Sequence, residues 1–598
     1  MQLGESVSGF SWANRIQGDK RNRRGSRGQN QILPRNSLLP VAASPNVIVL
    51  MNGFRPGIFL KILLRMDLCA PAEFRRARWD SWVPGAVFVR WLVGLLLSGL
   101  PGATISAADT GVFSGADLAE GKKLAQRYCA VCHPFPEPDL LDRATWRDGT
   151  LPFLRARLGI DRMDPTDPGQ KIVLDEWRQV WDYYLASAPE QAPPVLKPLQ
   201  VRGNLPGFTV LDPAYRPGKR FVTLVRIDPE ARRIYVGNAQ AKTLDVLDPN
   251  GGMLSSLQVD SPPVSLELKG GLWYGTLIGR VPPHNESLGR LIVLKKTGDV
   301  FSHESDLLVD LPRPTHGTLG DLNGDGRDDL VISGFGNITG ALTWYEAGTD
   351  GGYTPHVIFD RPGSVASRIV DLNRDGWNDL VVMMAQAREG VYALINRGGG
   401  EFYEIPIVEP HPAWGYSGFQ LLDFNGDGEL DLLTTNGDNG EYASCLKNYH
   451  GIRLYLSRGR GRFEQSFFVP LHGAFKAIAA DFDRDGDLDI AAISYFADYE
   501  HAPEQGFVYL QNQGEDRFEA FTFPASRSGR WLVMDAGDVD GDGDMDIVIG
   551  AASRTPYRVP RGLYESWMWE GPSLLVIRND LVPPAVAKDP NERTGAAP

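Results

Sequence analysis

The chain has 598 residues, which is too many for one hydrophobic core, so at least two domains are expected. Its charge is uneven: residues 1–108 carry a net charge of +9, while residues 109–598 contain 47 basic and 69 acidic residues, a net charge of −22. Such an acidic surface repels phosphate backbones and anionic lipids, which argues against nucleic-acid and membrane-surface partners, whereas clustered carboxylates attract divalent cations.

A signal peptide is predicted at residues 66–108. Basic residues at 75–78 precede an apolar run at 91–100, and small residues follow at 106–108. This order of basic, apolar and small residues is typical of a cleaved leader. We therefore expect a periplasmic or secreted bacterial protein.

The mature chain would begin near Asp109. Residues 1–65 show no lasting periodicity, and we interpret them as a disordered extension or the product of an upstream start codon. An uncleaved signal anchor is the alternative, but the apolar run is short for a bilayer span. Membrane association is not expected beyond that anchor.

A C-x-x-C-H motif follows the leader, formed by Cys129, Cys132 and His133. This motif is the signature of covalent haem c attachment, in which both thiols bond to the haem and the histidine ligates the iron. Haem attachment would consume Cys129 and Cys132, and cleavage of the leader would remove Cys69. Only Cys445 would then remain, so no disulfide framework is possible.

Two helices are predicted around the motif, at residues 114–128 and 172–186, with Gly121 allowing them to approach closely. Helices on either side of a haem-binding loop resemble a small single-haem cytochrome c domain, and the resemblance covers residues 109–190. A proline-rich linker is predicted at residues 191–214.

The second axial ligand of the iron is harder to predict. Residues 151–159 resemble the place where related proteins carry Leu-Pro-x-Met, but Leu154 stands at the methionine position and cannot ligate iron. Met163 is the internal candidate, because it is the only methionine between residues 109 and 200. Alternatively Met163 only packs or is exposed, and the iron is five-coordinate or takes a ligand from the rest of the chain. A methionine ligand would favour electron transfer, and an open site small-molecule chemistry.

An acidic nine-residue segment, D-x-[DN]-x-D-G-x-x-D, recurs five times, at starts 50, 52, 58 and 57 residues apart. This spacing is that of a four-stranded propeller blade, and an apolar strand follows each copy. The side chains at positions 1, 3, 5 and 9 of the five copies are Asp321, Asn323, Asp325, Asp329, Asp371, Asn373, Asp375, Asp379, Asp423, Asn425, Asp427, Asp431, Asp481, Asp483, Asp485, Asp489, Asp538, Asp540, Asp542 and Asp546.

Oxygen ligands at this spacing can converge on one hard cation, with the glycine at position 6 permitting the turn. No copy has the glutamate that an EF-hand needs at position 12, and a strand follows in place of a helix. The segments resemble the calcium loops of FG-GAP or VCBS repeats, which implies up to five Ca²⁺ ions and an integrin-like seven-bladed propeller. The alternative is a set of metal-free Asx turns.

Two further blades are predicted at residues 219–255 and 262–300, each with three strand-like runs. The predicted fold is therefore multidomain: a small all-α cytochrome c domain followed by an all-β seven-bladed propeller at residues 215–580, with a disordered tail at 581–598. The combination resembles bacterial cytochrome c and FG-GAP/VCBS repeat fusions.

Polar loops after equivalent strands emerge on one face of a propeller and can form a pocket there. Asp438, Lys447 and His450 are weak catalytic candidates in such a loop, and structural polar loops are the alternative. Similar clusters precede and follow this loop by one blade: Gln386, Arg388 and Glu389, then Ser494, Tyr495, Asp498 and Tyr499.

The function predicted from these motifs is exported haem c electron transfer, with the propeller as scaffold and recognition surface. The partner would be a redox protein or a small-molecule electron donor or acceptor. One alternative is a periplasmic propeller dehydrogenase that passes substrate electrons to its haem, and another is an extracellular glycan- or protein-binding module. The sequence does not decide whether the protein is an enzyme.

Overall fold

The computed structural model describes residues 115–131, 133–194, 199–218, 220–386, 388–440, 445–553 and 559–580. The predicted extension, the signal peptide, Cys132 and the predicted tail at 581–598 lie outside the described residues. They stay predictions from the sequence.

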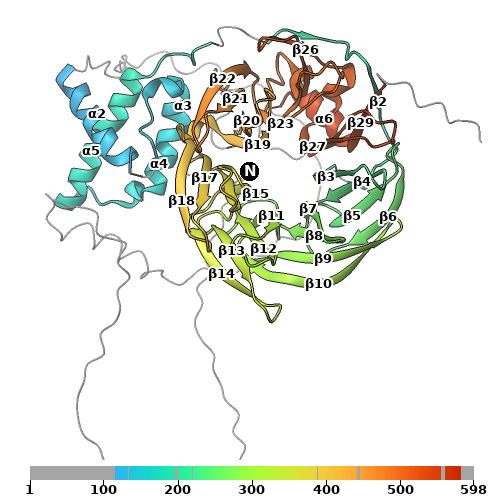
Figure 1. Ribbon diagram of the computed structural model, residues 1–598. Coiled ribbons are helices and arrows are strands. Elements are labelled where there is room, and N and C mark those ends of the chain that lie inside the picture. The colour runs from blue at the N-terminus through green and yellow to red at the C-terminus, as the bar shows by residue number, and fades with distance from the viewer. Residues whose placement is uncertain are drawn as a thin grey trace, which may run out of the picture. The chain divides into compact units, whose positions relative to one another are not determined.

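The first part of the described chain is helical (Figure 1). Its helices are α2 (Gly115–Cys129), η1 (Pro138–Leu140), α3 (Arg143–Thr145), η2 (Trp146–Thr150), α4 (Leu151–Arg157), η3 (Ile160–Arg162) and α5 (Pro168–Ser187). The two predicted helices correspond to α2 and α5. Asp167 caps α5, since its carboxylate accepts the N–H groups of Gly169 and Gln170, and Pro168 follows it at the first helical position. Within the described residues, no helix combines the length and the apolar character needed to cross a membrane.

One apolar core joins these helices. Its fully buried members include Trp146, Tyr184 and Val180, and the Trp146 and Tyr184 rings stack with centroids 4.2 Å apart. The predicted role of Gly121 is confirmed: a Cβ there would lie 2.7 Å from the carbonyl oxygen of Gln179 and 2.8 Å from the Cβ of Tyr183, both on α5. Only glycine lets α2 and α5 approach this closely.

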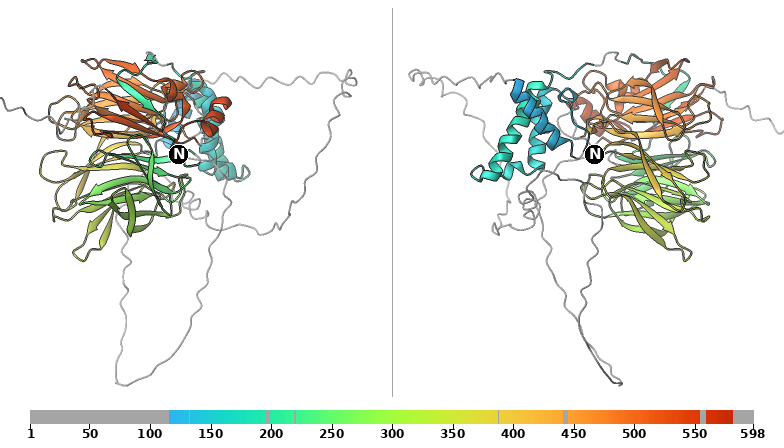
Figure 2. Two further views of the ribbon diagram at one scale, coloured as in Figure 1. Left: turned by 90° about the vertical axis from the view of Figure 1, so that its right-hand side faces the viewer. Right: turned by 60° about the vertical axis from the view of Figure 1, so that its left-hand side comes forward.

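The rest of the described chain forms seven β-sheets arranged in a ring (Figures 1 and 2). The first three blades consist of β3 (Val222–Asp228), β4 (Arg233–Asn238), β5 (Thr243–Leu247) and β6 (Met253–Gln258); β7 (Pro263–Lys269), β8 (Leu272–Leu277), β9 (Gly289–Thr297) and β10 (Val300–Leu311); and β11 (Pro314–Gly320), β12 (Asp329–Gly334), β13 (Ala341–Ala347) and β14 (Tyr353–Phe359). Blades 4 and 5 consist of β15 (Ser364–Val370), β16 (Asp379–Met384), β17 (Gly390–Asn396) and β18 (Phe402–Val408); and β19 (Tyr416–Leu422), β20 (Asp431–Asn436), β21 (Gly451–Ser457) and β22 (Phe463–Pro470).

Blades 6 and 7 each include a strand from the N-terminal side of the propeller. They consist of β23 (Ala474–Ala480), β24 (Asp489–Ser494), β25 (Phe507–Asn512), β26 (Phe518–Phe521) and β1 (Val201–Arg202); and β27 (Trp531–Gly537), β28 (Asp546–Ala551), β29 (Leu574–Asn579) and β2 (Phe208–Leu211). Short helices in the loops of the propeller are η4 (Pro412–Trp414), η5 (Pro503–Gly506), η6 (Pro524–Ser528) and α6 (Arg561–Trp569).

The ring closes through β2, which pairs antiparallel with β29, while β1 adds a parallel edge to β26. Both strands lie inside the predicted linker, so the propeller begins before residue 215. The sequence does not indicate these strands, because they are short and flanked by prolines, and because their partners lie at the far end of the propeller. Closure of the ring protects the edges of the terminal blades.

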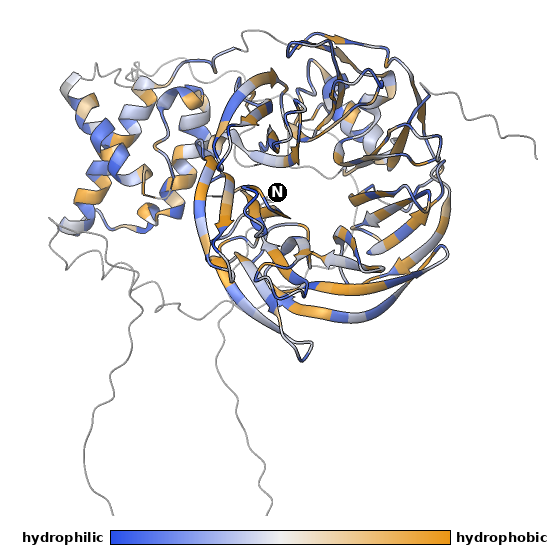
Figure 3. Cartoon of the chain, viewed as in Figure 1, coloured by the Kyte–Doolittle hydropathy of each residue, from blue (hydrophilic) through white to orange (hydrophobic). Residues whose placement is uncertain are grey.

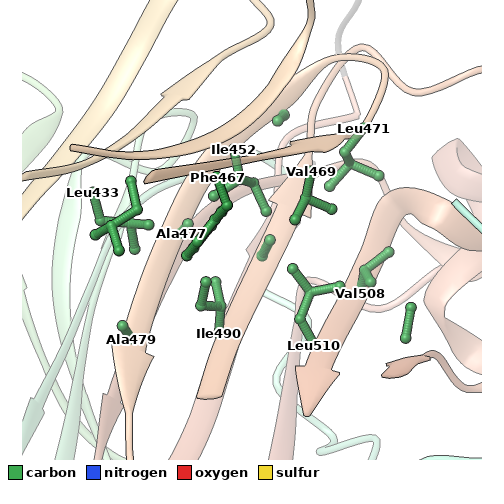
Figure 4. Close-up of a cluster of buried hydrophobic side chains, with 14 residues drawn as sticks. Leu433, Ile452, Phe467, Val469, Leu471, Ala477, Ala479, Ile490, Val508 and Leu510 are labelled. Atoms are coloured by element: carbon green, nitrogen blue, oxygen red, sulfur yellow. The ribbon is translucent and has the colours of Figure 1, made fainter. Parts of the chain in front are cut away.

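Apolar side chains from adjacent blades fill the space between the sheets. In blades 3 to 7 every residue of the second strand is buried, for example throughout β16 and β24. Hydrophobic stretches run along the strands of the ring in Figure 3. Figure 4 shows one such core, where Leu433 and Ile452 of blade 5 face Ile490 and Val508 of blade 6. The blades therefore stack through sequence-distant contacts as well as local ones.

Candidate functional site

A cavity of about 640 Å³ is lined both by the helical segment and by propeller loops. Cys129 and His133 of the C-x-x-C-H motif lie on its wall. Trp146, Phe153 and Leu154 add apolar surface from the helices, and the propeller contributes loops of blades 3 to 5. Both the volume and the largely apolar wall are typical of a site for a cofactor or a drug-sized ligand.

The core of the helical segment fixes the chain that follows the motif. Tyr184 donates a hydrogen bond from its hydroxyl to the carbonyl of Pro136 (2.9 Å), and the indole N–H of Trp146 donates to the carbonyl of Pro138 (2.8 Å). The Nδ1 atom of His133 lies 2.8 Å from the carbonyl oxygen of Pro134. A carbonyl only accepts, so Nδ1 carries a proton, and in the neutral imidazole Nε2 then keeps a free lone pair.

The thiol of Cys129 is held in its neutral form. Burial raises the pKa of this thiol to about 11. Reactive dithiol motifs need a thiolate and therefore a lowered pKa. The surroundings of Cys129 thus argue against a thioredoxin-like redox role for the C-x-x-C pair.

A second histidine from the propeller, His411, also lines the cavity. It lies just before η4, between blades 4 and 5, and its ring meets that of His133 with centroids 4.9 Å apart. Its Nδ1 atom accepts the N–H of Ala413 (3.0 Å), and its Nε2 atom is buried without a hydrogen-bond partner among the described residues. Burial, with added repulsion from His133 and Lys447, lowers the pKa of His411 to about 3.

Aromatic contacts stabilise the loop that carries His411. Trp414 stacks on Tyr449 with centroids 5.6 Å apart, and the guanidinium of Arg453 lies 4.3 Å from the centroid of Trp414. The hydroxyl of Tyr449 donates to the carbonyl of Leu140 in the helical segment (3.0 Å). Cys445 packs against the core of the helical segment. These contacts connect the loops of blade 5 to the helices that carry the C-x-x-C-H motif.

The five acidic segments each connect the first strand of a blade to the second, in blades 3 to 7. In blade 3 the carboxylate of Asp321 accepts the N–H groups of Gly324 (2.7 Å) and Gly326 (2.8 Å), and that of Asp325 accepts the N–H of Arg327 (2.9 Å). The loops therefore wind tightly around the side chains at positions 1 and 5, in the manner of Asx turns.

Two of the loops gather three carboxylates. In blade 6 these are Asp481, Asp483 and Asp485, and in blade 7 they are Asp538, Asp540 and Asp542. In each set, one carboxylate oxygen of every side chain lies within 4.8 Å of those of the other two. Hard oxygen ligands at this spacing suit Ca²⁺. The other three loops carry asparagine at position 3 and so have two carboxylates, not three, at positions 1, 3 and 5.

The ninth residue of each loop has a structural role. Asp329 is 0% exposed, and its two oxygens accept the N–H groups of Leu322 (3.0 Å) and Ala347 (2.8 Å). The same pair of backbone contacts recurs at Asp379, Asp431, Asp489 and Asp546. Burial raises the pKa of Asp489 to about 6 and that of Asp546 to about 7. The side chains at positions 1, 3 and 5 are therefore the ones left available to a cation.

Comparison with known families bears on these loops. Residues 321–382 and 371–434 match the model of the FG-GAP-like repeat, and residues 531–562 match that of the FG-GAP repeat. The propeller carries FG-GAP repeats. The matched stretches include the FG-GAP loops of blades 3, 4, 5 and 7.

No curated protein matches the chain. Similar solved structures include the Cps50 (Swd1) β-propeller domain of Myceliophteria thermophila, with 11% identity and a TM-score of 0.38 over 61% of this chain and 99% of that one. The N-terminal domain of Nup159 is another, with 12% identity and a TM-score of 0.35 over 64% of this chain and 97% of that one. A third is Sqt1 of Saccharomyces cerevisiae, with 9% identity and a TM-score of 0.38 over 63% of this chain and 99% of that one. At this similarity they carry no argument about the function of the FG-GAP propeller.

The structure brings some predicted site residues of the FG-GAP propeller together. Asp438 and Lys447 line the cavity, as do Gln386 and Glu389 from the preceding blade. His450 does not: it is 2% exposed, and burial together with the charge of Lys447 lowers its pKa well below the ordinary value. His450 is therefore a buried structural histidine.

Other predicted polar residues serve the blades. Arg388 forms an ion pair with Glu409 (2.6 Å). The hydroxyl of Tyr499 donates to the carbonyls of Ser494 (3.2 Å) and Tyr495 (3.0 Å). These contacts stabilise loops and need no ligand to explain them.

Met163 follows η3 and packs against the helical core. Among the described residues that line the cavity, Leu154 is present and Met163 is not. The geometry therefore does not place Met163 opposite His133. His411, which the sequence did not single out, contacts the ring of His133 directly. Its only sequence signal is a histidine in a Pro-Ala-Trp-Gly turn between two blades, and no known motif marks it.

Proposed function

We propose that the chain is an exported haem c protein in which the FG-GAP propeller completes the haem site. The observation that carries this proposal is that Cys129 and His133, from the C-x-x-C-H motif, line a cavity of about 640 Å³ whose wall is completed by other helical residues and by propeller loops. A haem attached through this motif would lie between the helices and blades 3 to 5.

The residues present fit the group. His133 offers an unprotonated Nε2 because Nδ1 is engaged with Pro134, as second-shell contacts commonly arrange for metal-bound histidines. Cys129 is a neutral, part-buried thiol that suits a thioether bond. Apolar side chains such as Trp146 and Ile338 would exclude water from the ring.

Haem c supplies one-electron transfer. The helices and propeller loops hold His133 in place and limit access of water, while the acidic outer surface would select cationic partners. The partner would be a redox protein or a small-molecule electron donor or acceptor. Export is supported by the predicted leader, which is a property of the sequence alone.

Calcium binding in the FG-GAP loops is the second part of the proposal. The carboxylate triplets of blades 6 and 7 support it most strongly, and the loops with asparagine at position 3 would bind more weakly. A bound cation would offset the repulsion among carboxylates held this close together.

A dehydrogenase is the second candidate, favoured by the presence of Asp438 and Lys447 on the wall of the same cavity. Reduction of the haem on addition of an alcohol or sugar would support it. An extracellular binding module fits the FG-GAP propeller equally well. It would be the remaining function if no haem were attached.

Intact-mass spectrometry of the secreted protein, matured with a haem c assembly system, tests the proposal. We expect one haem per chain that survives denaturation, and loss of that mass in the double variant Cys129→Ser/Cys132→Ser. Two unmodified thiols in the mature wild-type protein would refute haem attachment.

A further inference from the structure

We propose that the central channel of the FG-GAP propeller binds a small oxyanion, a carboxylate or a phosphate, between Arg226, Arg368 and Lys476. The central channel is the space enclosed by the first strands of the seven blades. None of these three residues lines the cavity beside the C-x-x-C-H motif. The inference therefore does not depend on haem attachment.

The first strand of every blade forms the inner edge of its sheet, and these strands surround the centre of the ring (Figure 1). Six of the seven first strands contribute a charged or titratable side chain to one group, which we call the channel cluster. Its members are Arg226 of β3, Glu267 of β7, His316 of β11, Arg368 of β15, Lys476 of β23 and Asp535 of β27.

Contacts between these side chains show that they face one another across the channel. Arg368 in blade 4 donates from Nη1 to Nε2 of His316 in blade 3 (2.9 Å), and the same Nε2 lies 3.4 Å from Oε1 of Glu267 in blade 2. A residue of blade 3 can meet side chains of both neighbouring blades at once only along the inner edge of its sheet. Burial lowers the pKa of His316 most, and Lys476 of blade 6, on the other side of the ring, lowers it further.

The channel cluster has an excess of positive charge. With His316 neutral, its three cations exceed its two carboxylates by one, whereas residues 109–598 carry a net charge of −22. One of the carboxylates has a structural partner, since Asp535 accepts the N–H of Ile227 (2.8 Å). Among the described residues, the side chains of Arg226 and Lys476 have no hydrogen-bond or ion-pair partner.

Solvent reaches the cations of the cluster although they lie on the innermost strands. Arg226 and Arg368 are exposed, and Lys476 is half-buried. Burial lowers the pKa of Lys476, and repulsion from Arg368 and Arg226 lowers it further, while Asp535 opposes this. A bound anion would relieve the repulsion among the three cations.

The types of side chain indicate the class of anion. A guanidinium presents parallel N–H donors that match two oxygens of a carboxylate or a phosphate, and an ammonium adds a point charge. The anion must be small, because Lys476 and His316 interact electrostatically from opposite sides of the ring. The shared chemistry is therefore that of a small oxyanion, and acetate and inorganic phosphate are suitable probes.

Isothermal titration calorimetry of the full chain tests this inference. The protein is first dialysed free of calcium and chelator, so that phosphate cannot bind through a metal ion, and the ionic strength is held constant. Phosphate and acetate are titrated into the wild type, Lys476→Met and Asp535→Asn. Lys295→Met is the matched control, because Lys295 is an exposed lysine of β9 and does not lie on a first strand. Lys476→Arg, which keeps the positive charge, is the second variant in case the methionine variant does not fold.

We expect at least one of the two anions to bind the wild type and Lys476→Met to weaken that binding about tenfold or more, because a charge-assisted contact is lost. Asp535→Asn should bind more tightly than the wild type, since it removes a competing negative charge but keeps an acceptor for Ile227. Lys295→Met should match the wild type, and Lys476→Arg should retain most of the affinity. Binding of acetate alone would assign the site to carboxylates, and binding of phosphate alone to phosphates. If neither anion bound the wild type at millimolar concentration, or if folded Lys476→Met bound as tightly as the wild type, the inference would be overturned.

Discussion

The ring of His411 meets that of His133 edge-to-face, with centroids 4.9 Å apart and planes inclined at 86°. One histidine belongs to the C-x-x-C-H motif and the other to the turn between blades 4 and 5. The contact is supported by the hydrogen bond from Tyr449 to Leu140. The surroundings of His133 are thus set jointly by the helices and by the FG-GAP propeller.

The close contact of α2 and α5 should make Gly121 intolerant of substitution. A Cβ would lie 2.7 Å from the Gln179 carbonyl oxygen, so Gly121→Ala forces the helices apart and should lower the free energy of unfolding by about 1–3 kcal/mol. Gly115→Ala, at the start of the same helix, meets no atom within 4 Å and should be neutral or slightly stabilising. Urea denaturation of both variants checks this, and equal stabilities would contradict it.

The ninth residue of an FG-GAP loop should matter far more than the eighth. Asp329→Ala leaves the buried N–H groups of Leu322 and Ala347 without acceptors and should cost about 2–5 kcal/mol. Asp328→Ala removes only an exposed ion pair with Lys269 (2.9 Å), worth at most about 1 kcal/mol. Thermal unfolding in excess chelator compares them without any contribution from metal. If Asp328→Ala lost as much stability as Asp329→Ala, the structural role of Asp329 would be refuted.

Calcium should reverse the sign of the stability change caused by one substitution in blade 7. Asp542→Asn removes one of three carboxylates that lie within 4.8 Å of one another. In excess chelator the variant should be at least as stable as the wild type, because repulsion is relieved. In saturating Ca²⁺ it should be less stable by up to about 3 kcal/mol, since an ion bound only by the native state stabilises it.

The control for this experiment is Glu515→Gln, which removes one charge from an exposed hairpin of blade 6. Its stability relative to the wild type should not depend on Ca²⁺. Melting temperatures that are the same in Ca²⁺ and in chelator for the wild type would show that the loops are metal-free turns.

Acid should destabilise the propeller through His450. Burial, the charge of Lys447 and the neighbouring His472 lower the pKa of His450 in the folded state, and Arg453 also opposes its protonation. A histidine with a lowered folded pKa contributes stability above its ordinary pKa of about 6.5, and this contribution is lost as the pH falls below that value. The loss is about 1.4 kcal/mol per pH unit.

Urea denaturation at pH 7.5, 6.5 and 5.5 measures this effect. The stability of His450→Gln should fall less steeply with acidification than that of the wild type. His303→Gln should follow the wild type, because its ring is exposed. Parallel curves for His450→Gln and the wild type would show that His450 is not held neutral.

The blades could be predicted because their signals are local. Each FG-GAP loop is bounded by a strand that the chain reaches within a few residues, such as β12 directly at Asp329, so spacing alone predicts the repeat. Closure by β2 could not be predicted, since its partner β29 lies at the opposite end of the propeller sequence. His411 could not be predicted for the same reason. It matters because its ring contacts His133, and the residues of its own turn do not indicate that contact.

Covalent haem attachment is tested most directly by a pyridine haemochrome spectrum of the secreted protein after acid extraction of free haem. We expect one haem per chain that stays with the polypeptide and shows the spectrum of a haem bound through two thioethers. A colourless polypeptide, or one whose haem is fully extracted, would contradict it.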